Sequence, residues 1–484
     1  MKLTVARMAR LFMVEEDAAA MARILKKITR FPAGVSLDAL GEAVLSETEA
    51  DVYAARILKL LAWLEAGPAQ RPDLSVKLSA LTPRFDPIDL EGSVERVLGR
   101  LEPLRAAAAR AGVSLTLDME NHDSRPLVLA VFRRLAERPG IPPGLALQAY
   151  RPDAEADLRS LLDLPWTPEQ PLRVRLVKGA YWDSEVALAA QRFWPSPVFT
   201  DKAATDAHFE RLTELLFEAG ERVYPMIASH NLRSLAHALA LARSLGRKST
   251  SWEVQMLHGM ADPLAAAVIG EGARLRIYLP VGDLIGAIAY LIRRLLENTA
   301  STSVLRQAYF DDAPPERLLV APLAPAPVPA APAAGFCNTP LADFSQVEPR
   351  QALHAALAQV AAEAGRDYPL HALQSATATW RDSRNPADPA HRLGRVELAG
   401  QAQAQQAVRQ AVIAFPGWRE TAVGERARLC REAARLMRER RFELAAWQVL
   451  EVGKAWREAD ADVAEAIDCW NYYADVAERL LDWR

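Results

Sequence analysis

The chain is short of the residues that would place it in several large classes of protein. Of its 484 residues only three are cysteines, Cys337, Cys430 and Cys469, and none belongs to a CxxC pair. We therefore expect a reducing compartment and neither a disulfide framework nor a cysteine-based zinc site. The eight histidines form no HExxH pattern, so no metal site is expected.

Long apolar runs and an excess of one charge are also missing. No segment offers the roughly 20 uninterrupted apolar residues that a membrane span needs, and residues 1–27 mix basic with acidic side chains, unlike a signal peptide. The formal net charge is only −3, which gives no electrostatic reason to bind nucleic acid. These absences predict a soluble, cytoplasmic protein that is at most peripheral to a membrane.

The first 310 residues show short apolar runs that alternate with amphipathic helical patterns. Eight of the runs indicate strands, at residues 34–40, 74–81, 113–119, 144–150, 173–179, 223–229, 252–257 and 274–279. Helical patterns between them include residues 93–111, 153–162, 205–219 and 232–245. Because each parallel step needs a crossover helix, this order favours an α/β fold with a closed (βα)8 barrel. A doubly wound open sheet is the alternative, although no GxGxxG follows the first strand.

Polar residues recur near the carboxyl ends of these strands, where barrels of this kind carry their chemistry. They are Lys77, Asp118, Glu120, Gln148, Tyr150, Arg175, Lys178, His230, Asn231, Gln255, His258 and Tyr278. Any one of them could be a satisfied structural residue. Their recurrence at one end of successive strands favours a functional cleft.

The run Arg-Val-Arg-Leu-Val-Lys-Gly-Ala-Tyr-Trp-Asp at 173–183 is the most informative. It predicts a buried strand that delivers cationic, glycine and aromatic groups to one place. Gly179 lets a ligand approach the backbone because it has no Cβ, and Arg175 and Lys178 need an anionic partner if they are buried. A planar, phosphate-bearing cofactor would use all of these groups. The alternative is a barrel strand whose basic residues face the surface.

The last barrel helix is expected at residues 283–298 and carries Arg293, Arg294 and Glu297. The residues before them are almost wholly apolar, which predicts a deeply packed helix whose arginines emerge into a cleft. A solvated charged face is the alternative. Arg294 and Glu297, at i and i+3, are placed to pair.

The character of the chain changes after residue 312. Residues 313–345 form a Pro/Ala-rich linker that separates a barrel domain, 1–312, from a largely helical second domain, 346–484. In the second domain, helices are predicted at 351–364, 402–414, 424–450 and 457–481, and a short strand at 373–380. It shows no glycine-rich phosphate loop and no plausible nucleophile, since Cys469 lies within a helical pattern.

With these residues in place, the barrel region resembles the proline dehydrogenase barrel of the bifunctional proline utilization A family. The matching segments are 36–43, 76–81, 147–150, 175–185, 197–200, 229–231, Gln-Met-Leu-His-Gly-Met at 255–260, 276–282 and Tyr-Leu-Ile-Arg-Arg-Leu-Leu-Glu-Asn at 290–298. Residues from about 336 on resemble the connector and the beginning of the aldehyde dehydrogenase half, through 380–386, 414–419 and 451–454. The family's nucleotide fold, nucleophilic cysteine and base glutamate do not follow before residue 484, so no aldehyde dehydrogenase activity is expected from this chain.

The resemblance implies an FAD-dependent oxidation of L-proline to 1-pyrroline-5-carboxylate, with electrons passed to a membrane quinone. By the same resemblance the substrate is held by Lys77, Arg293 and Arg294, walled by Leu176, Tyr181 and Tyr278, and organised by Asp118. The implied FAD residues are Gln148, Arg175, Val177, Lys178, Gly179, Ala180, Trp182, Thr200, Lys202, His230, Asn231, Gln255 and Glu297. Two alternatives stay open: an inactive fragment that needs a partner chain, and a flavin barrel acting on another amine or imine.

Overall fold

The structure is a computed structural model that describes residues 11–28, 30, 32–41, 43–67, 71–138, 143–260, 262–283, 314–323, 335–370 and 379–481. The chain divides into two compact units. Unit 1 comprises Met1–Leu188 and Ser196–Pro327, and unit 2 comprises Ala189–Pro195 and Val328–Arg484.

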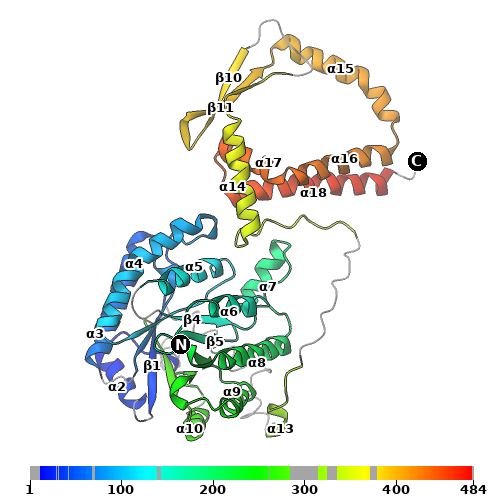
Figure 1. Ribbon diagram of the computed structural model, residues 1–484. Coiled ribbons are helices and arrows are strands. Elements are labelled where there is room, and N and C mark those ends of the chain that lie inside the picture. The colour runs from blue at the N-terminus through cyan, green and yellow to red at the C-terminus, as the bar shows by residue number, and fades with distance from the viewer. Residues whose placement is uncertain are drawn as a thin grey trace, which may run out of the picture. The chain divides into compact units, whose positions relative to one another are not determined.

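Unit 1 is a closed barrel of eight parallel strands, which confirms the predicted fold (Figure 1). The strands are β1 (Ala33–Ala39), β2 (Asp73–Val76), β3 (Ser114–Leu117), β4 (Gly144–Gln148), β5 (Leu172–Val177), β6 (Val223–Ala228), β7 (Glu253–Leu257) and β8 (Leu275–Val281). Each strand pairs with the next, and β1 pairs with β8 to close the barrel. The predicted second strand is shorter than expected, because the chain turns into a 3-10 helix at Leu78–Ala80.

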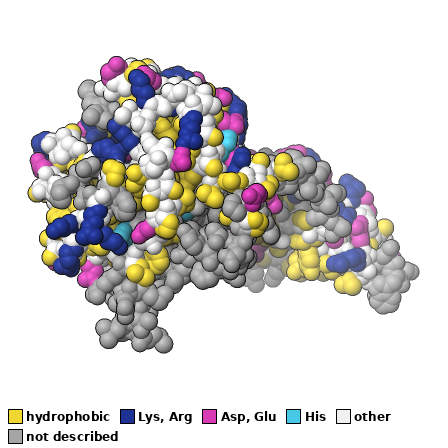
Figure 2. All heavy atoms as spheres, turned by 90° about the horizontal axis from the view of Figure 1, so that it is seen from below, with side chains coloured by type: hydrophobic (Ala, Val, Ile, Leu, Met, Phe, Trp, Pro, Cys, Tyr) yellow, Lys and Arg dark blue, Asp and Glu magenta, His cyan; other side chains and the backbone are white. Residues whose placement is uncertain are grey.

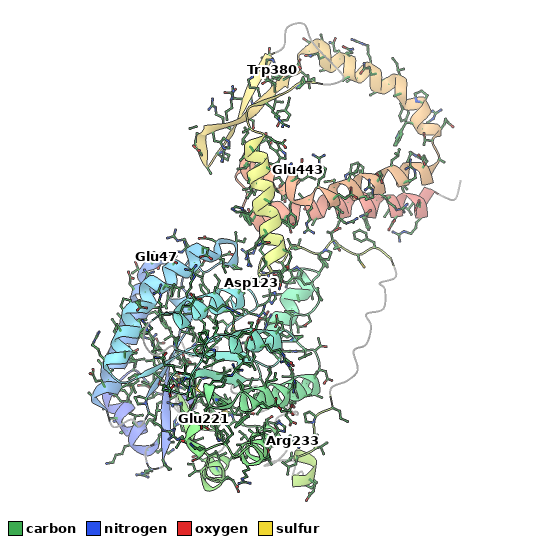
Figure 3. The ribbon with its side chains drawn as sticks, in the orientation of Figure 1. Glu47, Asp123, Glu221, Arg233, Trp380 and Glu443 are labelled. Carbon is green, nitrogen blue, oxygen red and sulfur yellow. The ribbon has the colours of Figure 1, made fainter. Side chains whose placement is uncertain are left out.

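Helices connect the strands and cover the outside of the barrel (Figure 1). They are α2 (Ala18–Ile28), α3 (Glu47–Ala66), α4 (Leu90–Arg110), α5 (Arg125–Ala136), α6 (Ala154–Leu162), α7 (Trp182–Gln191), α8 (Lys202–Glu218), α9 (Leu232–Ser244), α10 (Asp262–Gly270) and α13 (Pro315–Leu318). Several begin at a side-chain cap: the Ser46 hydroxyl accepts from Glu49 N–H ahead of α3, and Asp201 accepts from Ala203 N–H ahead of α8. The labelled Glu47 marks the start of α3 (Figure 3).

Alternation along the strands gives the barrel two different faces. Val35 and Leu37 on β1, fully buried, belong to the apolar core that also contains helix side chains such as Phe132 and Phe209. Ser36 and Asp38 occupy the intervening positions and are also buried. Because successive side chains of a strand point to opposite faces, the apolar set packs against the helices. The polar set points into the barrel.

Unit 2 contains five helices and a three-stranded sheet among its described residues. The helices are α14 (Val347–Ala362), α15 (Gln401–Glu420), α16 (Val423–Glu439), α17 (Arg441–Val452) and α18 (Trp456–Leu481). The sheet has the order β10 (Thr379–Asn385), β11 (Asp388–Leu398) and β9 (Arg366–Tyr368). The single helix predicted at 424–450 is wrong, because the chain breaks at Arg440, whose φ of −102° and ψ of 19° lie outside the helical range. Most of the strand predicted at 373–380 lies outside the described residues.

The elements of unit 2 differ in how much of their surface is covered. Helices α16 and α18 lie side by side (Figure 1), joined by Arg431, which donates to Asp475 at 2.7 Å and to Glu478 at 3.0 and 2.5 Å. On the sheet, the Arg395 guanidinium lies 5.3 Å from the ring centroid of Trp380, which Figure 3 labels on β10. Helix α15, by contrast, buries none of its 20 residues against the described chain.

The described surface matches the near-neutral composition. On the face drawn in Figure 2, Lys and Arg side chains intermix with Asp and Glu over the described residues. Within the described ranges, no helix combines the length and the apolar character that crossing a bilayer requires.

Candidate functional site

A cation held between two carboxylates occupies the carboxyl end of the barrel. Lys77 directly follows β2, and its Nζ lies 2.6 Å from Asp38 Oδ1 on β1 and 3.4 Å from Asp118 Oδ2 after β3. The Lys77 side chain retains 14% of its exposure. Tyr53 on α3 fixes the backbone here, since its hydroxyl accepts from Lys77 N–H at 3.2 Å. The structure thus brings together the predicted Lys77 and Asp118 and adds Asp38.

The charges of this triad depend on one another. Burial by itself would lower the pKa of Lys77, but the negative charge of Asp38, reinforced by other neighbours, holds it well above its usual range. Burial raises the pKa of Asp118, and the charges of Lys77 and Arg175 oppose that rise. Lys77 is therefore a fixed cation at neutral pH, suited to binding an anion such as a carboxylate.

Arg175 lies beneath this triad, inside the barrel, with every donor engaged. Its five hydrogen bonds run to side-chain oxygens of Gln255 (2.8 Å), Ser75 (2.6 Å), Asp118 (2.9 Å), Ser36 (3.2 Å) and Asp73 (3.2 Å). Its guanidinium carbon also lies 5.1 Å from the ring centroid of Tyr278 on β8. The predicted residues Arg175, Gln255 and Tyr278 are therefore in one cluster with Asp118.

A second ion pair closes the lower end of this polar interior. Arg276 on β8 donates to Glu253 on β7 through Nε at 2.5 Å and Nη2 at 3.0 Å. Gln255 links the two layers: its amide nitrogen donates to Glu253 at 2.8 Å while its amide oxygen accepts from Arg175. Burial opposes ionisation of Glu253, but the charge and hydrogen bonds of Arg276, with help from Gln255, lower its pKa to about 2.

The free energy of unfolding should consequently fall at acidic pH, because Glu253 becomes protonated there. The pKa of this group is depressed from 4.5 to about 2 on folding. Its contribution is therefore complete above pH 4.5 and is lost as the pH falls toward 2, to a limit of about 3 kcal/mol. Chemical denaturation at several pH values should give a steeper loss of unfolding free energy for the wild type than for Glu253→Gln. Equal slopes would contradict this assignment.

Two further predicted residues shape the mouth of the barrel. Gln148, at the end of β4, donates from its amide to the carbonyls of Met119 and Glu120, both at 3.1 Å. The Glu120 carboxylate accepts from the Ser79 hydroxyl at 2.5 Å and from Ser79 N–H at 3.2 Å. These bonds tie the ends of β2, β3 and β4 together, with Gln148 almost fully buried.

The turn that follows β5 packs against the aromatic ring of Tyr150. Gly179 has a φ of +137°, and a Cβ there would be 2.4 Å from Cγ of Tyr150. Backbone bonds hold the two segments together, because Tyr150 N–H donates to the Lys178 carbonyl at 2.7 Å and Phe199 N–H donates to the Tyr150 carbonyl at 2.7 Å. The indole N–H of Trp182 reaches the same loop, at 2.8 Å from the Phe199 carbonyl.

The remaining predicted cofactor residues form an accessible rim around this turn. Lys178 and Lys202 both pair with Asp206 on α8. Trp182, Ala180, Thr200 and Lys202 are exposed, and Val177, Lys178, Tyr181, His230 and Asn231 are partly exposed. Burial lowers the pKa of Lys178, and the charge of Asp206 opposes this.

His230 and Asn231 also have structural duties. The His230 ring accepts from Leu257 N–H at 3.1 Å, and Asn231 caps α9 by accepting from Ser234 N–H at 3.0 Å. Leu176 is different again: it is fully buried in the apolar core. As the neighbour of Arg175 on β5 it points to the opposite face of the strand, so the structure does not bring it together with the polar cluster.

The rim fits a planar, anionic cofactor such as FAD. At Gly179 the position of a Cβ is taken by the Tyr150 ring, so the missing Cβ serves this contact within the chain and adds no space for a ligand. Lys178 and Lys202 supply positive charge, and Trp182, whose residue is 42% exposed, offers an aromatic face.

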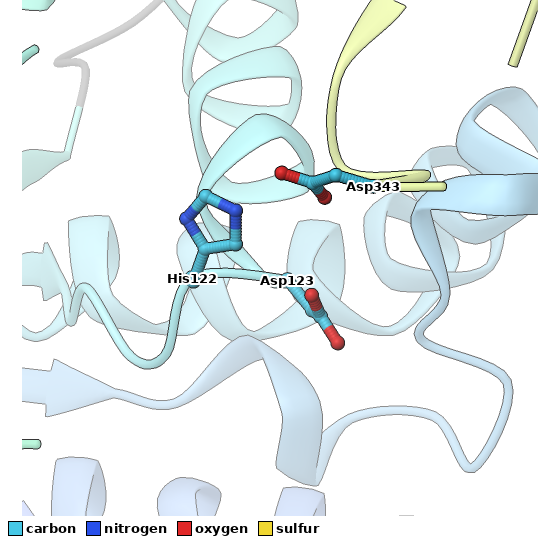
Figure 4. A group of neighbouring side chains, drawn as sticks. All are labelled: His122, Asp123 and Asp343. Carbon is cyan, nitrogen blue, oxygen red and sulfur yellow. The ribbon is translucent and has the colours of Figure 1, made fainter. Parts of the chain in front are cut away.

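A polar cluster beside the rim was not predicted from the sequence. His122 and Asp123 lie in the loop between β3 and α5 (Figure 4). His122 N–H donates to Glu185 on α7 at 2.7 Å, and Arg151 Nη2 lies 3.1 Å from His122 Nδ1. The cluster links the loops that follow β3, β4 and β5, and so supports the rim from its side.

The sequence reading also missed the deepest members of the site: Asp38, Asp73, Glu253 and Arg276. All four are buried. Asp73 and Glu253 begin their strands and Arg276 is the second residue of β8, away from the carboxyl ends where site residues were expected, whereas Asp38 lies near the carboxyl end of β1 and was missed there. The signal was present as period-two alternation of polar residues within otherwise apolar strands: Ser36 and Asp38, Asp73 and Ser75, Arg173 and Arg175, Glu253 and Gln255, Arg276 and Tyr278. Arg293, Arg294 and Glu297 lie outside the described residues.

Comparison with known proteins agrees with this geometry. The family model for proline dehydrogenase matches residues 21–307, and that of the aldehyde dehydrogenase family matches residues 373–484. The bifunctional protein PutA of Klebsiella aerogenes is 31% identical over 475 residues, covering 91% of this chain and 36% of the relative. Proline dehydrogenase 1 of Bacillus subtilis is 28% identical over 295 residues, covering 61% of this chain and 88% of the relative.

A solved structure extends the likeness to nearly the whole chain. Proline utilization A from Bdellovibrio bacteriovorus, crystallised after inactivation by N-propargylglycine, superposes with a TM-score of 0.91 at 36% identity, covering 99% of this chain and 53% of that one. The chain thus spans about a third of the length of the bifunctional curated relative and about half of this solved one. With a barrel that superposes on a solved relative and a family match over more than half of its residues, the chain belongs to the proline dehydrogenase family.

Proposed function

We propose that the barrel oxidises L-proline to 1-pyrroline-5-carboxylate with bound FAD and passes the electrons to a membrane quinone. The observation that carries this proposal is the Lys77 cation, held by Asp38 and Asp118 above Arg175 and beside Tyr278. It lies in a barrel whose residues 21–307 match the proline dehydrogenase family. Reaction in the cytoplasm, at a membrane surface, fits this acceptor.

Each group near Lys77 has a role in binding the substrate. Lys77, with Arg293 and Arg294, is proposed to hold the carboxylate of proline, since a buried anion needs fixed cations and guanidinium forks suit a carboxylate. Asp38 and Asp118 hold Lys77 in place and keep it charged. The rings of Tyr278 and Tyr181 are proposed to wall the pyrrolidine ring, whereas Leu176, which the sequence placed there, lies in the apolar core.

Besides binding of the substrate, the reaction needs a neutral amine and an acceptor for the hydride. The amine of proline must be neutral before a hydride can leave the adjacent carbon, and no covalent nucleophile is needed. When bound, FAD supplies the acceptor for that hydride. The rim residues Val177, Lys178, Gly179, Ala180, Trp182, Thr200, Lys202, His230 and Asn231, with Gln148, Arg175, Gln255 and Glu297, are proposed to hold it.

The domain boundaries complete the proposal. We place the catalytic barrel in residues 1–312, a linker in 313–345, and an N-terminal part of an aldehyde dehydrogenase domain in 346–484, in keeping with the family match at 373–484.

The anaerobic visible spectrum of the purified protein tests this function. Flavin bands that bleach on addition of L-proline, and return with a soluble quinone, are expected. Arg294→Met should keep the flavin bands but require a proline concentration at least about 100-fold higher, because a charge-assisted contact to the carboxylate is lost. Flavin that proline does not reduce would exclude proline as the substrate. A colourless protein that FAD cannot reconstitute would favour the inactive-fragment alternative.

A further inference from the structure

Asp73 and Glu253 are buried carboxylates that touch neither the rim nor the Lys77 triad. Both are fully buried, at the first positions of β2 and β7. We propose that these two carboxylates are positioning residues, which fix the guanidinium plane of Arg175 from below so that its charge is presented to the cofactor in one orientation. The inference rests on the proposed flavin function and adds two residues to it.

Asp73 acts on Arg175 directly. Its Oδ2 accepts from Arg175 Nη2 at 3.2 Å and from the Ser36 hydroxyl at 2.6 Å, and Ser36 itself accepts from Arg175. Its Oδ1 accepts from the Thr116 hydroxyl at 3.0 Å. Thr116 on β3 therefore fixes the Asp73 carboxylate, which in turn holds Nη2 of the Arg175 guanidinium.

Glu253 acts through Gln255. An amide side chain has a donor end and an acceptor end, and its neighbours decide which way it points. Glu253 accepts from the amide nitrogen of Gln255 at 2.8 Å, which turns the amide oxygen toward Arg175 Nε, also at 2.8 Å. With the amide reversed, an NH2 group would face a guanidinium. Glu253 thus determines that Gln255 is an acceptor for Arg175.

Burying ion pairs costs free energy that apolar residues in their place would not, and this supports a positioning role for Asp73 and Glu253. Replacing a buried ion pair by apolar residues of similar volume is often neutral or stabilising. The barrel nevertheless buries the Arg276–Glu253 pair and the Asp73–Arg175 pair in its interior. Their alternation with outward apolar residues shows that much of the interior face on β1, β2, β5, β7 and β8 is built from polar groups. Orientation of Arg175 is what this network supplies to the site.

The first test is Asp73→Asn, with Thr116→Val as its matched control. The control removes another hydrogen bond of Asp73 and leaves the contacts of Arg175 intact. The apoprotein is titrated with FAD, and the visible band and reduction potential of the bound flavin are recorded. For D73N we expect at least a tenfold higher dissociation constant, a displaced flavin band, and a fall in kcat of about tenfold with less than a threefold change in KM. The T116V values should stay within twofold of the wild type.

The direction of the change in FAD affinity distinguishes a displaced Arg175 from the simple loss of a negative charge. FAD is anionic, so removing a buried negative charge would by itself tighten its binding. Weaker binding in D73N therefore reports a displaced Arg175, whereas tighter or unchanged binding with an unchanged band overturns the proposal.

The double variant Glu253→Met/Arg276→Met carries the test if D73N does not fold. It replaces an ion pair by apolar side chains and frees Gln255 to reverse, and it leaves every direct partner of Arg175 in the sequence. We expect a melting temperature close to that of the wild type with FAD binding weakened at least fivefold. Wild-type flavin properties in the folded double variant, or failure of both variants to fold, would overturn the positioning role. If the wild type itself binds no FAD, it is the proposed function that fails, and the inference falls with it.

Discussion

Replacing Lys77 by methionine is expected to lower the unfolding free energy by about 3 kcal/mol at pH 7, because the change leaves two carboxylates without their shared cation in a site of little exposure. In the variant, the pKa of Asp118, which burial already raises, would rise further because the charge of Lys77 no longer opposes the effect of burial. The folded state then binds protons that the unfolded state does not, so the deficit should shrink as the pH falls from 7 to 5. Denaturant titrations of the wild type and the variant at both pH values measure this deficit in unfolding free energy.

The same variant should lose kcat/KM for proline by about 100-fold or more, since truncating one partner of a desolvated charge pair costs 2–5 kcal/mol. Lys59→Met is the matched control. Lys59 forms an ion pair with Glu16 at 3.2 Å, but its side chain is 70% exposed, so its loss should change stability by no more than about 0.5 kcal/mol. A K77M protein as stable as K59M at pH 7 would refute the buried triad.

Alanine at Gly179 should have the second large effect. The φ of +137° disfavours any L side chain, and the new Cβ would lie 2.4 Å from the ring of Tyr150. Strain of this kind costs about 1–3 kcal/mol, and the clash adds to it. We expect a loss of about 3–4 kcal/mol in unfolding free energy and little or no retained flavin. The absorbance ratio of flavin to protein after purification reports the second effect.

Gly112→Ala is the control that separates the effect of backbone strain from the effect of a steric clash. Gly112 also has a positive φ, +64°, but an added Cβ there meets nothing within 4 Å. Its replacement should cost about 1 kcal/mol and leave flavin content unchanged. If G179A and G112A were equally destabilised, the contact between Gly179 and Tyr150 would have no energetic importance.

The regular part of the fold was predictable because each strand is a short segment rich in apolar residues, separated from the next by a helical pattern. All eight strands lie within two residues of their predicted starts, and the one clear overextension, past Val76, comes from a 3-10 turn. The break at Arg440 was not predictable, since the residues on both sides of it favour a helix, and α17 then packs on α18. Propensity alone cannot place such a break.

Most of the predicted site residues stand in the carboxyl-terminal half of a strand or just after it, whereas Asp73, Glu253 and Arg276 stand at or next to the first residue of theirs. Lys77, Asp118 and Arg175 were anticipated and lie together. Asp73 and Arg276 were not, because a charged residue in an apolar run has no stated partner until the barrel closes and brings another strand beside it. Leu176 shows the reverse: its sequence neighbourhood pointed to the site, but the strand's alternation places it in the core.

The way the barrel closes determines when its parts become stable during folding. Arg276 arrives on the last strand, where it neutralises Glu253 and donates to the carbonyl of Val35 on the first strand, 241 residues earlier. Contacts across so long a separation form late, because the entropy of closing the loop must be spent first. A nascent chain that stops before β8 therefore lacks the main cation that pairs with Glu253, and it has two open sheet edges. The contacts that close the barrel therefore form only when β8 is available, which couples the stability of the first strand to that of the last.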